Sequence, residues 1–371
     1  MKPSPFRWAV WPLIAGLVYI LFFDNPTNDP GIDAPLRSIF LTQLFIASDY
    51  IVLTDVQHEL RRSDQHEPIS KSSFWARLHW ALCLFSNTRG VGWAHEPKGV
   101  FSIHPQPTRG RFIISQFLRM GLYLVILDIV HAIVASSSIY AENSIPTVSQ
   151  PYYWQLFGAL LFALGSSASI NIAHTTLSII SVGIGISEPQ RWPPFFGNWT
   201  ETCTVRAFWG RTWHQNMRRL VSSHGKHLAR FLNLPTGSKA SGFVQLCTAF
   251  VITGIIHIHP SDIRPLYFFM AQILAITFED ALIAATAKAG YNSPTKLHKA
   301  LGLTWVVLWF TFSSPGYMDS MIDSGMLRAG PRYDVGIASR AIDYSRPVVK
   351  YLDSLISLWI GWSPASIIQS G

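Results

Sequence analysis

The stretch YYWQLFGALLFALGSSASINIAHTTLSIISVGIG (residues 152–185) decides the fold, because it contains no aspartate, glutamate, lysine or arginine. A helix needs about 20 apolar residues to cross the hydrocarbon core of a bilayer. The stretch is longer than one upright span requires, so we expect it either to tilt or to break near GSSAS (165–169). These small residues would equally allow a neighbouring helix to pack closely.

Apolar segments of spanning length recur along the chain. They fall near 7–23, 36–54, 112–138, 152–185, 242–259, 263–287 and 299–316, with a weaker one at 351–368. Only 13% of the 371 residues are charged, about half the usual share in soluble domains. The sequence therefore predicts an all-α fold: a polytopic transmembrane helix bundle of about eight spans, forming one integral-membrane domain over residues 1–371.

The charges of the loops alternate along the chain. Segment 24–35 carries three aspartates and no basic residue, whereas 55–111 and 186–241 each carry eight lysines and arginines. The positive-inside rule places both basic loops and the N-terminus in the cytosol, and leaves the side of 317–350 unassigned. This pattern also accounts for the net charge of +8 without nucleic acid as a partner. Residues 8–23 lack a following cleavage site, so we interpret them as a retained first span.

Both basic loops contain segments that suit the membrane surface. SSFWARLHWALCLF (72–85) mixes aromatic and polar residues as an interfacial helix does. Residues 204–233 also look helical, with apolar positions among basic neighbours. The polar and aromatic stretch AFWGRTWHQNMRR (207–219) is therefore expected at the cytosolic membrane boundary.

Histidines are the residues best suited to chemistry in this chain. His131, His174, His257 and His259 lie within or beside apolar stretches, where ionisable side chains are costly and often functional. The alternative for each is a hydrogen-bonded histidine in helix packing. A metal site is not expected, because the three cysteines are far apart and no HExxH pattern occurs. No G-x-S-x-G nucleophile elbow is present either.

The segment PPFFGNWTETCTVRAFWGRTWHQNMRR (193–219) resembles the signature of the wax synthase-like branch of the membrane-bound O-acyltransferase superfamily. The matching positions are Thr204, Arg206, Phe208, Trp209, Gly210, Arg211, Trp213 and His214. ITGIIHIHP (252–260) supplies the family's later histidine, His257, in an apolar helix. NTRGVGWAHEPKG (87–99) resembles an Arg-Gly-x-Gly-Trp element of the fungal members, which act as secondary-metabolite acetyltransferases.

The resemblance implies roles for these residues. His257 would be the general base that takes the proton of the acceptor hydroxyl, and His214 would orient the thioester or donate a hydrogen bond to it. Arg206, Arg211, Arg218 and Arg219 would contact the phosphates of coenzyme A, with membrane headgroups as their alternative partners. Trp209 and Trp213 would line this cofactor site. The residue that orients His257 stays open, because Ile258 stands where many relatives have glutamate.

The resemblance further implies an acetyl-CoA-dependent enzyme of the endoplasmic reticulum, without a metal. Its partners would be membrane lipid, acyl-CoA and a hydrophobic, terpenoid-type alcohol. A long-chain wax ester or sterol ester synthase is the alternative within the family. An integral-membrane terpene cyclase or a transporter is the alternative outside it. The acids that a cyclase would use are Asp49, Asp128, Glu279 and Asp280, and no internal repeat of the kind common in transporters is visible.

Overall fold

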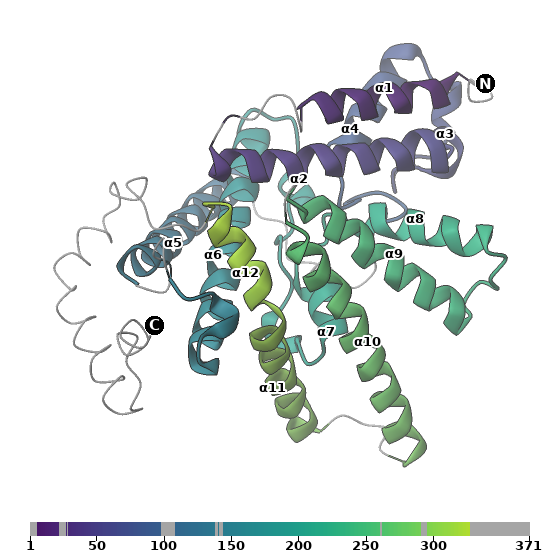
Figure 1. Ribbon diagram of the computed structural model, residues 1–371. Coiled ribbons are helices and arrows are strands. Elements are labelled where there is room, and N and C mark those ends of the chain that lie inside the picture. The colour runs from purple at the N-terminus through teal and green to yellow at the C-terminus, as the bar shows by residue number, and fades with distance from the viewer. Residues whose placement is uncertain are drawn as a thin grey trace.

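The computed structural model describes residues 6–21, 27, 29–97, 108–137, 140, 144–259, 262–290 and 295–326. This part of the chain is built from helices and connecting loops (Figure 1). The expected span at 351–368 and most of the 317–350 segment lie outside the described residues.

Within the described part, five helices are long and apolar enough to cross a membrane. They are Ile32–Leu53, which joins α2 (Pro30–Ala47) to the π-helical η2 (Ser48–Leu53), then α5 (Arg109–Ser136), α6 (Tyr152–Gly183), α9 (Lys239–His257) and α10 (Arg264–Lys288). The predicted all-α membrane fold is confirmed.

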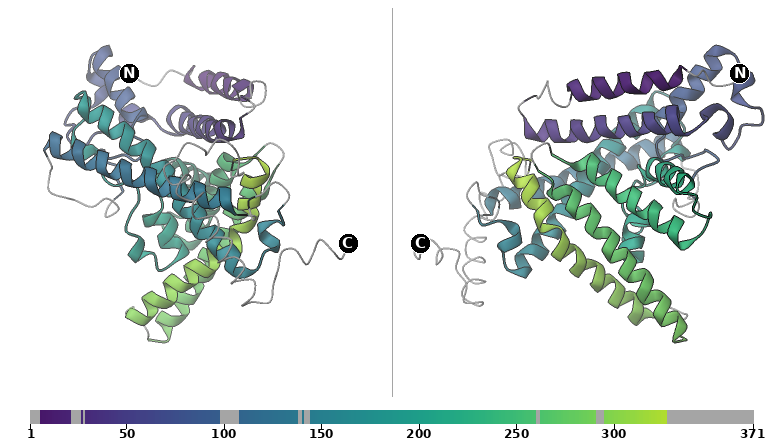
Figure 2. Two further views of the ribbon diagram at one scale, coloured as in Figure 1. Left: turned by 90° about the vertical axis from the view of Figure 1, so that its left-hand side faces the viewer. Right: turned by 45° about the vertical axis from the view of Figure 1, so that its right-hand side comes forward.

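The predicted number of eight spans is not confirmed. The helix α1 (Arg7–Tyr19) has 13 residues, which is too short to cross a bilayer alone. It lies beside α2 (Figure 2). The helix α11 (Lys296–Ser313) has 18 residues but carries Lys296, His298 and Lys299 in its first turn, which lowers its hydropathy.

The long apolar run predicted at 152–185 forms one continuous helix, α6, without a break at 165–169. Its 32 residues correspond to about 48 Å, so it must tilt across a hydrocarbon core of about 30 Å or extend beyond that core. Gly165 faces Val130 of α5, where an added Cβ would come within 3.1 Å of a valine methyl. Gly165 therefore allows α5 to pack closely against α6.

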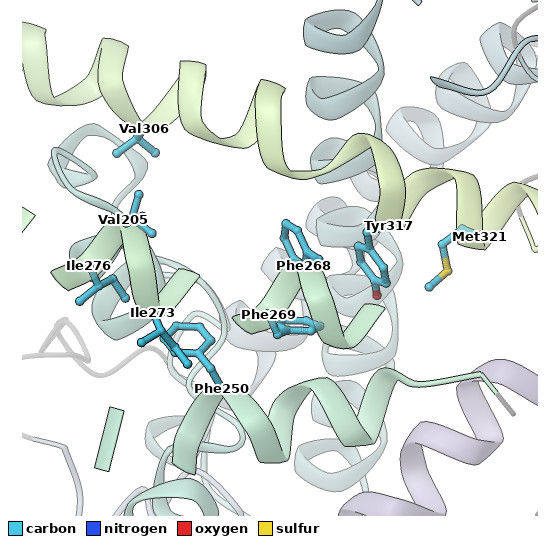
Figure 3. Close-up of a cluster of buried hydrophobic side chains, with 10 residues drawn as sticks. Val205, Phe250, Phe268, Phe269, Ile273, Ile276, Val306, Tyr317 and Met321 are labelled. Atoms are coloured by element: carbon cyan, nitrogen blue, oxygen red, sulfur yellow. The ribbon is translucent and has the colours of Figure 1, made fainter. Parts of the chain in front are cut away.

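A hydrophobic cluster at the centre joins the C-terminal helices (Figure 3). Phe268, Phe269 and Ile276 of α10 meet Phe250 of α9 and Tyr317 of α12 (Pro315–Asp323). The rings of Phe268 and Tyr317 are stacked, with centroids 5.0 Å apart. This cluster fixes the C-terminal half of α9, which carries His257.

The two predicted interfacial segments differ in outcome. The first forms a helix, α4 (Phe74–Phe85), that exposes large side chains such as Phe74 and Trp75. The second is not one helix. A short α7 (Val205–Ala207) runs into a π-helical turn, η8 (Phe208–Thr212), and a loop separates this turn from α8 (Arg218–Phe231).

The helix α8 lies alongside α9 (Figures 1 and 2). Gly225 makes this close approach possible, because a Cβ there would lie 2.9 Å from the Cα of Gln245. The start of α8, and with it the preceding loop, is thereby held near the C-terminal half of α9, where Leu220 packs against Ile252 and Ile256.

Candidate active site

A chamber of about 1130 Å³ lies between α2, α5, α6, α9, α10, α11, α12 and the segment around η8. Its lining is mostly apolar, with a few polar side chains. His214 and His257 both line it, as do Trp209, Trp213 and Arg218. Two segments that are about 40 residues apart in sequence therefore meet at one cavity.

His257 is the last residue of α9, and its orientation is fixed within the helix. Its Nδ1 lies 2.8 Å from the carbonyl oxygen of Thr253, one turn earlier. A carbonyl can only accept, so Nδ1–H must be the donor. In the neutral ring, Nε2 then carries the free lone pair. The ring also packs on Phe269, with centroids 4.8 Å apart. The orienting partner of His257, left open by the sequence, is thus a main-chain carbonyl.

His214 lies in the loop after η8, enclosed by aromatic rings. Its centroid is 5.8 Å from that of Phe195 and 5.7 Å from that of Trp213. Its Nδ1 is buried and has no hydrogen-bond partner among the residues that the structure describes. Burial, together with the proximity of His257 and the charge of Arg89, lowers the pKa of His214 to about 3. The ring is therefore neutral at physiological pH.

Trp209 is held in the chamber wall by a hydrogen bond that the sequence did not reveal. Its Nε1–H donates to Oε1 of Gln272 at 3.3 Å, and Trp309 donates to the same oxygen at 2.9 Å. Gln272 is fully buried in α10 and donates to the carbonyl of Phe268 at 2.9 Å. A polar residue inside an apolar span was the available signal.

The carbonyl groups around η8 are satisfied by two side chains that follow it. Gln215 donates through Nε2 to the carbonyls of Trp209 and Trp213, at 3.1 and 2.7 Å. Arg218 donates to the carbonyl of Gly210 at 2.8 Å and to Oε1 of Gln215 at 3.0 Å. Burial and the neighbouring charge of Arg211 lower the pKa of Arg218. Arg211 itself is exposed and does not line the chamber.

Arg206 lines the chamber but already has an acidic partner. Its Nε and Nη2 donate to Asp280 at 3.0 and 2.5 Å, and the ion pair is about half exposed. The neighbouring Glu279 is buried and accepts from the backbone N–H groups of Val205 and Arg206, at 2.5 and 3.1 Å. This pair of acids fixes the start of α7.

The fourth signature arginine, Arg219, has a partner outside the chamber. Its Nε lies 3.1 Å from Oδ2 of buried Asp49. None of the four acids considered for a cyclase, Asp49, Asp128, Glu279 and Asp280, lines the chamber. Among the described residues, no group of three or more histidine, cysteine or acidic side chains is placed to hold a metal ion.

The upstream RGVGW element docks onto the signature segment. Arg89 is buried and donates to the carbonyls of Pro193 and Pro194, at 3.0 and 2.7 Å. Its guanidinium also lies 5.0 Å from the ring centroid of Phe195, which packs on His214. Gly90 and Gly92 have positive φ angles of 71° and 75°, which the turn after Arg89 requires. The first basic loop therefore supports the wall around His214.

Comparison with known proteins assigns the chain to a family. The profile of the membrane bound O-acyl transferase family matches residues 192–262. Acetyltransferase ple2 of Rhodocybe pseudopiperita is 34% identical, and the match covers 87% of this chain and 86% of that protein. The chain belongs to the membrane bound O-acyl transferase family. Acetyltransferase eriL of Hericium erinaceus is 33% identical, over 85% and 84% of the two chains. Acetyltransferase TRI7 of Fusarium sporotrichioides is 26% identical, over 76% and 72%.

Family membership confirms that this is an integral membrane O-acyltransferase. The matched residues 192–262 include both His214 and His257. The resemblance drawn from the F-W-G-R-x-W motif is thereby confirmed, and so is its direction toward fungal acetyltransferases of secondary metabolism.

Proposed function

We propose that this O-acyltransferase moves the acetyl group of acetyl-CoA to a hydroxyl of a hydrophobic, terpenoid-type secondary metabolite. The observation that supports this most strongly is the hydrogen bond from Nδ1–H of His257 to the carbonyl of Thr253. It leaves Nε2 as a base at the wall of a mostly apolar chamber. A base within reach of an alcohol is what acyl transfer requires.

In the proposed reaction, Nε2 of His257 accepts the proton of the acceptor hydroxyl while its oxygen attacks the thioester carbonyl carbon. The carbonyl oxygen becomes an oxyanion, and the neutral His214 ring offers one N–H donor to it. The carbon–sulfur bond then breaks. The proton on His257 passes to the departing thiolate, so that the products are the acetate ester and coenzyme A. No covalent acyl-enzyme is needed.

Coenzyme A would bind at the side of the chamber where η8 and α8 meet. Arg218 and Arg211 together make this region cationic, and guanidinium groups match phosphates well. Arg206 would contribute less, since Asp280 already neutralises it. Trp209 and Trp213 would form the wall beside the pantetheine arm. The two basic loops would face the cytosol, with the enzyme in the endoplasmic reticulum and its N-terminus cytosolic.

The test is an assay of membranes that contain the enzyme, with acetyl-CoA labelled in the acetyl group and a panel of terpenoid alcohols. The label should appear in an acetate ester of the added alcohol. Palmitoyl-CoA in place of acetyl-CoA distinguishes a wax ester or sterol ester synthase. Faster transfer of the long acyl chain, with fatty alcohols or sterols as acceptors, would contradict the acetyltransferase proposal.

A further inference from the structure

A second, smaller cavity of about 230 Å³ lies between α5, α6 and residues 192–199, and we call it the α5–α6 pocket. Its polar lining includes Gln116, Arg119, Asn171 and His174. Aromatic walls are supplied by Trp192, Phe195, Phe196 and Trp199. The proposed acyl transfer uses none of these polar groups.

Two buried polar side chains of this pocket have ring or amide atoms without a hydrogen bond among the described residues. Gln116 is 3% exposed, and its Oε1 has no hydrogen bond among the described residues. His174 is 9% exposed and is held between the rings of Trp192 and Phe195, at 5.3 and 4.8 Å. No hydrogen bond to its ring nitrogens is present in the part of the chain that the structure describes. Buried polar groups are normally paired, so this pocket suits a ligand with hydroxyl groups, which donate and accept.

Arg119 lies at the same pocket, on the exposed side of α5. Within the described ranges it makes no ion pair or hydrogen bond. It lies inside a candidate span, ten residues, or about 15 Å, from the first residue of the helix. An arginine in a span normally has a partner, and among the described residues no carboxylate lines the pocket. A phosphate of a bound ligand can pair bidentately with the guanidinium and supply the missing anion.

We propose that the α5–α6 pocket binds the headgroup of an acidic phospholipid of the phosphatidylinositol class. Arg119 contacts the phosphate, and the ring hydroxyls enter the pocket toward Gln116, Asn171 and His174. Basic pockets between membrane helices bind such headgroups. A volume of 230 Å³ equals that of about seven or eight waters at roughly 30 Å³ each, which is sufficient for a polyol ring. The lipid belongs to the leaflet that holds the N-terminal half of α5.

The pocket is connected to the catalytic chamber through one aromatic ring. Phe195 packs on His174 at 4.8 Å and on His214 at 5.8 Å, and the guanidinium of Arg89 lies over it. Trp199 lines both cavities. A bound headgroup therefore supports the wall that holds His214, and the lipid stabilises the folded enzyme as well as occupying a site.

The experiment uses the full-length protein in nanodiscs of phosphatidylcholine alone, or with phosphatidylinositol or phosphatidic acid added. Lipid retention is measured by native mass spectrometry and stability by Tm, both independent of acyl transfer. Phosphatidylinositol should be retained over phosphatidic acid and should raise Tm. Arg119→Leu should reduce its retention by about ten-fold or more, the effect of losing a hydrogen bond to a charged group. Gln116→Leu removes a neutral hydrogen bond to a hydroxyl and should reduce retention by roughly two- to ten-fold.

Arg111→Leu is the matched control, since it removes the same charge from the same helix outside the pocket. Its retention of phosphatidylinositol should equal that of the wild type. An equal loss of phosphatidylinositol retention in Arg111→Leu would mean that the lipid is held only by general attraction to basic residues, and it would overturn the proposal. Equal retention of phosphatidic acid would overturn the role of the hydroxyls. Displacement of the lipid by coenzyme A would assign the pocket to the acyl donor instead.

Discussion

The indole N–H of Trp209 donates to the side-chain oxygen of Gln272, a fully buried amide in α10. The F-W-G-R-x-W motif thus depends on a residue far outside it. Trp309 donates to the same oxygen, so one amide holds two indole rings around the chamber.

Gln272→Leu should destabilise the protein and reduce activity. The leucine has a similar size but leaves two partly buried indole N–H groups without an acceptor, at a cost of up to about 1–3 kcal/mol each. Trp209 should also lose its fixed position. Tm in detergent and the rate of acetyl transfer check this. Trp309→Phe is the milder control, because it removes one donor and leaves the Trp209 hydrogen bond intact. Wild-type stability in Gln272→Leu would contradict the role of the amide.

His257→Ala should lose most of kcat, by about 10²–10⁴-fold for the removal of a general base, while coenzyme A binding persists. His259→Ala should be far milder, because the proposed base is His257 and His259 lies past the end of α9, beyond its C-cap residue Ile258. Thr253→Val should also retain most of the activity, since the acceptor for His257 is the main-chain carbonyl. Equal losses of kcat in the His257 and His259 variants would contradict the assignment of His257 as the general base.

The acid stability of the enzyme should depend on His214. Its folded pKa of about 3 lies below the ordinary value near 6.5, because burial disfavours the charged ring. The unfolded chain therefore binds more protons between these values. The contribution of His214 to the free energy of unfolding is fully present above about pH 6.5 and is lost as the pH decreases toward 3. His214→Asn should weaken this decrease in Tm. His227→Asn, an exposed change on α8, should leave it unchanged. An identical pH profile in all three proteins would argue against a buried neutral His214.

Arg211→Ala and Arg218→Ala should raise the KM for acetyl-CoA. Loss of one phosphate contact corresponds to roughly ten-fold for an exposed arginine. Arg218→Ala should also lower kcat, because Arg218 donates to Gly210 and Gln215 and so holds η8. The control is Arg230→Ala, an exposed arginine at the other end of α8. Measurements at saturating alcohol that leave the KM unchanged in Arg211→Ala and Arg218→Ala would separate these arginines from coenzyme A.

The topology can be tested at two exposed serines. Ser72 precedes α4 in the first basic loop, and Ser149 lies in the short connection before α6. In sealed microsomes, an impermeant maleimide should label Ser72→Cys directly. It should label Ser149→Cys only after permeabilisation, because the positive-inside rule places the two on opposite sides. Direct labelling of Ser149→Cys alone would reverse the orientation.

Much of the architecture was accessible from the sequence, since apolar length is a direct physical requirement of a bilayer. Five of the predicted spans form suitable helices. The motif and His257 were also expected to meet, and they do so at one chamber. The roles of these residues in catalysis and coenzyme A binding stay predictions.

Contacts between distant polar residues were not predictable in the same way. Hydropathy gives no partner for Gln272, Glu279 or Arg89, whose hydrogen bonds cross between elements. Residues 204–233 look continuous by composition. The chain nevertheless turns between Trp213 and Arg218, because Gln215 and Arg218 satisfy the carbonyls of η8. The sequence indicates Arg206 as a phosphate ligand and gives no sign of its ion pair with Asp280.

The length of α6 makes bilayer thickness a variable of the reaction. A single rod of about 48 Å can match hydrocarbon layers of different depth by changing its inclination. Its residues from Ala159 to Ile170 form one wall of the chamber, and they move with that inclination. The spacing between this wall and His257 should consequently depend in part on the thickness of the host membrane, so a thicker bilayer should change the shape of the cavity that the two substrates are proposed to share.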